Sequence, residues 1–169
     1  MSDAKNKVDW CLKKAERELK KSGKHRGLVK TKPNIEKARE YIKKAEHYLR
    51  ATNYLKKGDF SDISASTVFY SMYHCLLAIA AKFGYESRNQ ECTITAIEHF
   101  IQGKKLDIDQ SYIDMIRKEM EGQKKMGAKS TREEMQYGAK TKLEETRCKI
   151  LMDNAKRFVE KMRAVLKTI

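Results

Sequence analysis

The sequence has little of the two residues that most often interrupt helices and mark linkers. One proline and eight glycines among 169 residues exclude collagen-like, proline-rich and low-complexity chains. Hydrophobic residues make up 40% of the chain, which is too large a share for a disordered tail. A chain of this length can bury roughly 70% of its unfolded surface. The composition therefore predicts one globular chain with its own hydrophobic core.

Long hydrophobic runs are absent as well. The longest unbroken apolar stretch covers residues 75–81, whereas a bilayer span needs roughly 20 residues. The first five residues, Met-Ser-Asp-Ala-Lys, lack the apolar core of a secretory signal. We therefore expect a cytoplasmic protein that does not bind a membrane.

Cysteine is scarce, and no pair has the Cys-x-x-C spacing of a zinc ribbon or a redox dithiol. His74 and Cys75 are adjacent, but neighbours on a helix point about 100° apart and do not chelate together easily. We therefore expect neither a metal nor a cofactor. In a chain without an export signal, cysteines are expected to be reduced thiols. We therefore expect this state for all four cysteines of the chain: Cys11, Cys75, Cys92 and Cys148.

Negative charge is in short supply, because 37 Lys and Arg face 23 Asp and Glu, for a net charge of +14. The excess lies mainly in residues 1–59, which carry 18 basic and 8 acidic residues, whereas residues 60–99 carry 2 and 4. Clustered Lys and Arg attract phosphates and are typical of nucleic-acid binding. A solvated, lysine-rich helical surface has the same composition, so charge leaves both interpretations open.

Apolar residues recur at the helical period in every long segment, and no segment shows sustained alternation. The pattern predicts an all-α fold, an up-and-down antiparallel bundle of about five or six helices. A basic linker around residues 22–33 divides the chain into an N-terminal basic helix and loop, residues 1–33, and a bundle, residues 34–169. Residues 122–140, with three glycines and five Lys or Arg, are expected to form a basic loop.

One face of the expected helix at residues 61–83 differs from the rest. The helix is apolar on nearly all sides, as expected for a helix enclosed by others. A narrow stripe of small and polar residues follows helical spacing and permits a close helix contact or a polar cleft. This polar stripe consists of Ser64, Thr67, Ser71, His74, Ala78 and Lys82.

Two sequence segments resemble the small prokaryotic HEPN-domain proteins. They are Phe69-Tyr-Ser-Met-Tyr-His74-Cys-Leu-Leu, and Gly84-Tyr-Glu-Ser-Arg88-Asn89 followed by the helix at residues 92–100. Residues 38–60, residues 132–137 and the last helix are also similar to that family, so the resemblance covers about residues 34–169. It implies a helical bundle that dimerises. Many such proteins are metal-independent ribonucleases, often toxins paired with a minimal nucleotidyltransferase.

The resemblance also shows a departure from the catalytic motif of the family. Active members have an Arg followed by a polar residue, with a His four to six positions after the Arg. Arg88-Asn89 begins this motif, but Thr93 stands where the His would fall. A hydroxyl does not titrate near pH 7, so the general acid or base is missing. His74, on the preceding helix, is the only plausible substitute.

We therefore expect a HEPN-like homodimer that binds RNA or a nucleotide without catalysis. The contacts are expected from an inter-subunit cleft lined by the polar stripe and from basic segments at residues 20–32 and 124–132. The expected binding residues are Arg88, Asn89, Ser71, His74, Lys24, Arg26, Lys129 and Arg132. Two alternatives stay open. One is a toxin-like, metal-independent ribonuclease that uses Arg88 and His74, and the other is a protein-only partner of a nucleotidyltransferase in a toxin–antitoxin pair.

Overall fold

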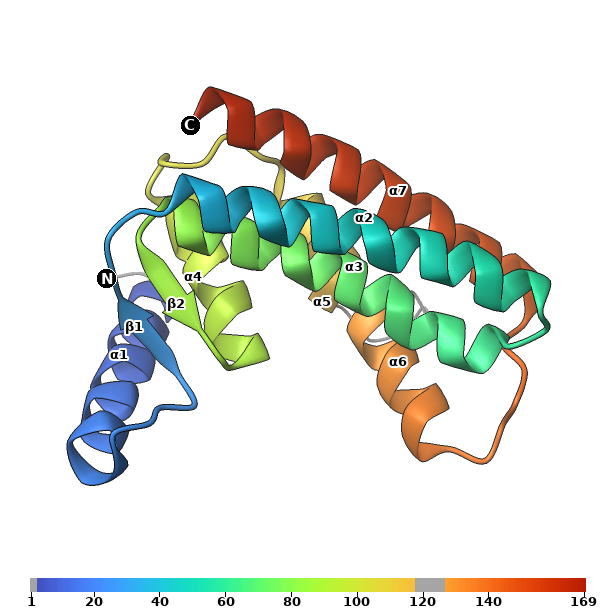
Figure 1. Ribbon diagram of the computed structural model, residues 1–169, viewed down its shortest axis with the longest axis horizontal. Helices are drawn as coiled ribbons and strands as arrows, with labels where there is room; N and C mark the ends of the chain where they lie inside the picture. The colour runs from blue at the N-terminus through green and yellow to red at the C-terminus, as the bar shows by residue number, and fades with distance from the viewer. Residues whose placement is uncertain (1–2, 118–126) are drawn as a thin grey trace.

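A computed structural model describes residues 3–117 and 127–169, which form seven helices and one short two-stranded sheet (Figure 1). The elements in chain order are α1 (Asp3–Ser22), β1 (Leu28–Lys30), α2 (Ile35–Lys57), α3 (Ser61–Lys82), β2 (Tyr85–Ser87), α4 (Gln90–Gln102), α5 (Gln110–Arg117), α6 (Ala128–Tyr137) and α7 (Glu145–Thr168). The expected all-α fold is confirmed.

The three longest helices, α2, α3 and α7, lie side by side and form the bundle (Figure 1). Helix α2 begins after its N-cap Asn34, whose side chain accepts a hydrogen bond from the backbone amide of Lys37 at 2.8 Å. Helix α3 runs antiparallel to α2. Helix α7 runs parallel to α3, as two contacts show: one joins the first turns of α3 and α7, and the other joins their last turns. Ser64 Oγ lies 3.9 Å from Cys148 Sγ, and Lys82 Nζ donates to the carbonyl of Leu166 at 3.2 Å.

Helix α3 is the centre of the hydrophobic core. Its 22 residues are long and apolar enough to cross a membrane, but 78% of its most apolar window is buried inside the chain. Phe69, Met72 and Leu76 are fully buried there. Such burial is typical of the core helix of a folded domain, and helices α2, α6 and α7 cover the sides of α3.

The polar stripe of α3 packs inside the chain. The hydroxyl groups of Thr52 and Thr67 are hydrogen bonded at 2.7 Å, which brings α2 and α3 close together. Ser71 is fully buried, and its hydroxyl donates to the backbone carbonyl of Val68 at 2.7 Å. The stripe therefore makes the close helix contact that its small residues permit. The expectation that it lines an inter-subunit cleft is wrong for Ser71, because the chain itself covers this residue.

The N-terminal segment packs on α4 and β2 at one end of the bundle (Figure 1). Strand β1 pairs with β2 in an antiparallel register that places Leu28 opposite Ser87 and Lys30 opposite Tyr85. Strands of three residues are too short to show alternation, so the sequence pattern could not predict them. The pairing joins the expected N-terminal unit, residues 1–33, to the expected bundle.

Gly84 makes this pairing possible. Its φ of +77° is in the left-handed region, and a Cβ atom at this position would lie 2.7 Å from the carbonyl oxygen of Thr31. The amide of Thr31 in turn donates to the carbonyl of Gly84 at 2.8 Å. Only glycine allows the two backbones to approach this closely.

Two other expectations differ from the structure. Helix α6 occupies most of the described part of residues 122–140, so the prediction of a loop there is wrong; residues 122–126 lie outside the described residues. Buried Ala128, Thr131, Arg132 and Met135 hold this helix against α3, a tertiary contact that outweighs the glycine-rich composition. The Ser87-x-x-Gln90 pattern of the sequence predicts Ser87 as the N-cap of α4, but the N-cap is Asn89, whose side chain accepts from the amide of Cys92 at 2.9 Å.

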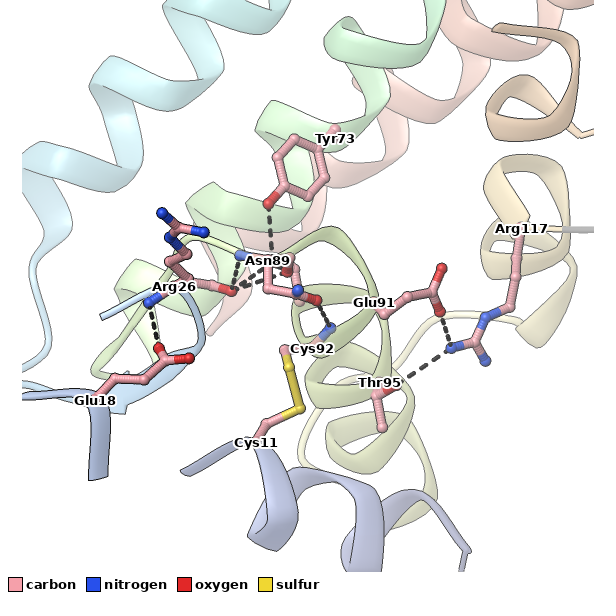
Figure 2. Close-up of a disulfide and its surroundings, with 11 residues drawn as sticks. Cys11, Glu18, Arg26, Tyr73, Asn89, Glu91, Cys92, Thr95 and Arg117 are labelled. Carbon is pink, nitrogen blue, oxygen red and sulfur yellow. Dashed lines mark hydrogen bonds and ion pairs between the residues drawn. A yellow bond between two sulfur atoms is a disulfide. The ribbon is translucent and has the colours of Figure 1, made fainter. Parts of the chain in front are cut away.

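The cysteines also differ from expectation. Cys11 on α1 and Cys92 on α4 form a disulfide, with an S–S distance of 2.12 Å (Figure 2). The prediction of four reduced thiols is therefore wrong for this pair, because the sequence does not show that α1 packs on α4. Cys75 and Cys148 are free and buried.

Candidate nucleic-acid interface

The strand pairing brings together two groups of predicted binding residues that are distant in the sequence. Arg88 follows β2 directly, and its backbone amide donates to the carbonyl of Gly27 at 2.9 Å. Arg88 therefore lies beside the N-terminal basic segment, residues 20–32, which contains no Asp or Glu. The side chain of Arg88 is 57% exposed, and Lys24, Arg26 and Lys30 are exposed as well. The result is one surface of cations at the edge of the molecule.

Glu86 fixes the two sides of this surface to each other. Its Oε1 atom accepts from Arg88 Nε at 3.1 Å and lies 3.4 Å from Nε2 of His25, which is only 6% exposed. Burial would raise the pKa of Glu86, but the hydrogen bond from Arg88, the positive charge of Lys37 and the contact with His25 together lower it. The carboxylate therefore stays ionised and holds the guanidinium and the basic segment in place.

The basic segment is also held from α1. Glu18 on α1 accepts a hydrogen bond from the backbone amide of Arg26 at 2.7 Å (Figure 2). Because this bond uses the backbone, the guanidinium of Arg26 stays exposed. Within the described residues, Lys24, Arg26 and Lys30 form no ion pair, so their charges are available to an anion.

Thr93, at the position of the family's histidine, lies in the interior. It is fully buried, its hydroxyl donates to the carbonyl of Asn89 at 2.8 Å, and it lies 2.7 Å from Ser87 Oγ. The hydroxyl of Tyr73 lies 3.1 Å from Thr93 Oγ1, and burial raises the pKa of Tyr73 even though this hydrogen bond opposes the shift. The network connects α3, β2 and the first turn of α4. Thr93 therefore positions the Arg88–Asn89 turn and does not face solvent.

His74 is placed differently from the expected substitute base. Its Nδ1 atom lies 2.7 Å from the carbonyl of Tyr70, and its ring stacks on Tyr48 of α2 with 5.1 Å between centroids. Burial lowers the pKa of His74, the hydrogen bond with Tyr70 raises it, and Lys44 lowers it further, for a net lowering. Within the part of the chain that the structure describes, no hydrogen bond or ion pair joins His74 to Arg88.

The second predicted basic segment, residues 124–132, contributes little free charge where it is described. Lys129 pairs with Glu91 of α4, and burial, which would raise the pKa of Glu91, is outweighed by Lys129 and Arg117, which lower it. Arg132 is 7% exposed and lies over the ring of Phe69, 4.8 Å from the centroid. Both cations hold α6 in place. Residues 124–126 lie outside the described residues.

Sequence reasoning missed His25 and Glu86, which hold this surface together. Neither residue belongs to a recognisable motif, and their contact depends on the antiparallel register of β1 and β2. An acidic residue two positions before Arg88 is the one signal in the sequence, and it does not identify its partner.

The fold is an all-helical bundle with a basic turn before its fourth helix, and a comparison of the sequence with family models agrees. The model of the HEPN domain matches residues 38–165. The match covers well over half of the chain, so the protein belongs to the HEPN domain family. The resemblance found in the sequence is thereby confirmed. No curated protein matches the chain. Helix α1, strand β1 and the N-terminal basic segment all precede the matched region.

Proposed function

We propose that this HEPN-domain protein binds RNA without cleaving it, through the cationic surface formed by the N-terminal basic segment and Arg88. The observation that carries the proposal is the β1–β2 pairing, extended by the bond from the Arg88 amide to the carbonyl of Gly27, which joins Arg88 to the segment that carries exposed Lys24, Arg26 and Lys30. Lys and Arg side chains on one surface neutralise several phosphates of a backbone and release counterions. The HEPN domain, which is common in RNA-binding and RNA-cleaving proteins, supports RNA as the ligand.

The same geometry supports binding over catalysis. Thr93 is buried and engaged in hydrogen bonds, and the ring of His74 stacks on Tyr48 of α2. His25 shares the carboxylate of Glu86 with Arg88, but its side chain is 6% exposed, and its buried Nδ1 atom has no hydrogen-bond partner among the residues that the structure describes. A general base must come within about 3 Å of the hydroxyl that it deprotonates. None of these three residues presents a titrating group to the cationic surface.

The test is RNA binding measured by fluorescence anisotropy over a range of salt concentrations. We expect affinity for a labelled RNA to fall steeply as salt rises. The triple variant Lys24→Glu, Arg26→Glu, Arg88→Glu should bind at least about tenfold more weakly and should lower the salt dependence. The matched control changes three exposed cations of α7 in the same way, Lys149→Glu, Arg157→Glu and Lys167→Glu, and should retain most of the affinity.

Each outcome decides between the open alternatives. Equal loss in both triple variants would mean that only net charge matters and would contradict the placement of the surface. Absence of binding at low salt would favour a partner that binds protein only. Cleavage of the RNA by the wild-type protein in the presence of a chelator, abolished in His74→Ala or His25→Ala, would establish the ribonuclease instead.

We also propose that the protein is a homodimer, because HEPN domains commonly dimerise. Sedimentation velocity at several protein concentrations tests this directly. A monomer at all concentrations would contradict it and would leave the RNA surface as a feature of the single chain.

A further inference from the structure

Helix α1 carries a second feature that the cationic surface does not include. Its buried face consists of Ala4, Val8, Cys11 and Ala15, which pack on α4 and β1. At 100° per residue, five positions between residues 10 and 21 lie within an arc of about 100° on a different side of the helix. They form what we call the tryptophan stripe: Trp10, Lys13, Lys14, Arg17 and Lys21.

Trp10 is the unusual member of this stripe. It is the only tryptophan in the sequence, and it is 55% exposed on a helix whose apolar face is already buried. The ammonium of Lys14 lies 5.1 Å from the centroid of its ring. Three of the four acidic residues of α1 are engaged elsewhere, since Asp3 pairs with Lys7, Glu16 pairs with Lys20, and Glu18 accepts from the amide of Arg26. The ring is therefore an aromatic surface in a positively charged environment.

We propose that Trp10 stacks on an unpaired RNA base while the cations of the tryptophan stripe bind the flanking phosphates. This inference rests on the proposed function and adds the class of RNA, which is single-stranded. Proteins bind single strands by combining aromatic stacking with a basic track along the backbone. Only unpaired bases offer a free π-face, whereas a duplex offers phosphates alone. The stripe ends at Lys21, inside the N-terminal basic segment, so one strand can follow α1 onto the surface beside Arg88.

Because Trp10 is the sole tryptophan, its fluorescence reports on the site directly. We expect single-stranded oligouridylate to quench this fluorescence, and a blunt RNA duplex of equal charge to quench it much less. Trp10→Ala should weaken binding of the single strand about tenfold, in the range of measured base–aromatic stacking. The affinity of Trp10→Ala for the duplex should differ from that of the wild type by less than about twofold. Trp10→Tyr should restore most of the affinity, because a tyrosine ring also stacks.

The matched control is Tyr54→Ala, which removes an aromatic side chain that is 80% exposed on α2, outside the stripe. It should leave affinity for the single strand unchanged. If Trp10→Ala binds the single strand as tightly as the wild type, the stacking inference is overturned. The proposed function still stands in that case, provided that the Lys24, Arg26 and Arg88 triple variant loses affinity. A blue shift of Trp10 fluorescence with phosphatidylserine vesicles, together with no response to RNA, would overturn the inference in favour of a lipid surface.

Discussion

The bundle of α2, α3 and α7 and the N-terminal segment of α1 and β1 are held in different ways. The bundle shares a continuous core around α3, with Phe69, Met72 and Leu76 fully buried. The N-terminal segment is attached by a few buried side chains, a three-residue strand pair and one disulfide. Yet the N-terminal segment, residues 3–30, carries ten Lys or Arg and only four Asp or Glu. Burial of apolar side chains therefore stabilises the bundle. The N-terminal segment exposes its charges, so it depends on the strand pair and the disulfide to stay attached.

The largest effect should come from a charge placed in the bundle. Ser71→Glu introduces an unpaired carboxylate at a fully buried position of α3. We expect the free energy of unfolding to fall by about 5 kcal/mol, because nothing there solvates or pairs the charge. Chemical denaturation followed by circular dichroism measures this change. Asn53→Glu, at an exposed position of α2, is the control and should change stability by less than about 0.5 kcal/mol. Equal stability of the two variants would contradict the burial of the polar stripe.

The next effect concerns the attachment of the N-terminal segment. The disulfide joins residues 81 positions apart, so the chain-entropy estimate of its contribution to unfolding is about 4 kcal/mol. Cys11→Ser with Cys92→Ser should therefore lower stability by about this amount. It should also let Trp10 report unfolding at a lower urea concentration than circular dichroism does, because α1 separates first. Coincident transitions for both probes would show that the two regions unfold as one unit.

Reduction provides the control for this prediction. Dithiothreitol should destabilise the wild-type protein and should leave the double serine variant unchanged. Destabilisation of both proteins would show that the effect of the reductant does not come from the Cys11–Cys92 disulfide and would contradict this prediction.

A smaller effect is expected at Thr93, where the two regions meet. Thr93→His enlarges a fully buried side chain and disturbs its contacts with Ser87 and Asn89, at a cost of about 2 kcal/mol. Restoring the motif spacing should therefore lower the melting temperature and should not create a nuclease. A fluorogenic RNA in the presence of chelator measures cleavage, and Thr93→Val is the control for loss of the hydroxyl. Cleavage by Thr93→His that also requires Arg88 would show that the buried site can open to substrate.

The smallest effect is a pH dependence of the bundle. Burial lowers the pKa of His74 below its ordinary value of 6.5 in the folded protein, so folding favours the neutral ring. The contribution of His74 to stability is then fully present above pH 6.5 and decreases as the pH falls toward the lower, folded pKa. We expect a slight decrease in melting temperature between pH 7 and pH 5, which His74→Gln should reduce. An increase in stability over this range would contradict the direction of the shift.

The bundle could be predicted from the sequence much better than the cationic surface. Helical periodicity predicted α2, α3 and α7, because each long helix buries one face or more in a shared core. Helix α6 was missed because its glycine-rich flanks suggest a loop, while its contacts with α3 are tertiary.

The candidate site illustrates the same limit. Arg88 and Asn89 could be selected from a local motif, and Lys24 and Arg26 from local charge. That these residues lie together depends on Leu28 pairing with Ser87, and on His25 reaching Glu86, which local patterns do not encode. For the same reason, spacing could not show that Ser71 is covered or that Arg132 is held by Phe69.

The disulfide and the strand pair also determine the order in which the chain can fold during synthesis. Helix α1 leaves the ribosome before the residues that hold it, Ser87 of β2 and Cys92 of α4, are made. Contacts between segments so far apart in the sequence form late, since a long loop must close before they contribute. Helix α1 therefore remains undocked while α2 and α3 are made, and during that time its lysines extend from the nascent chain.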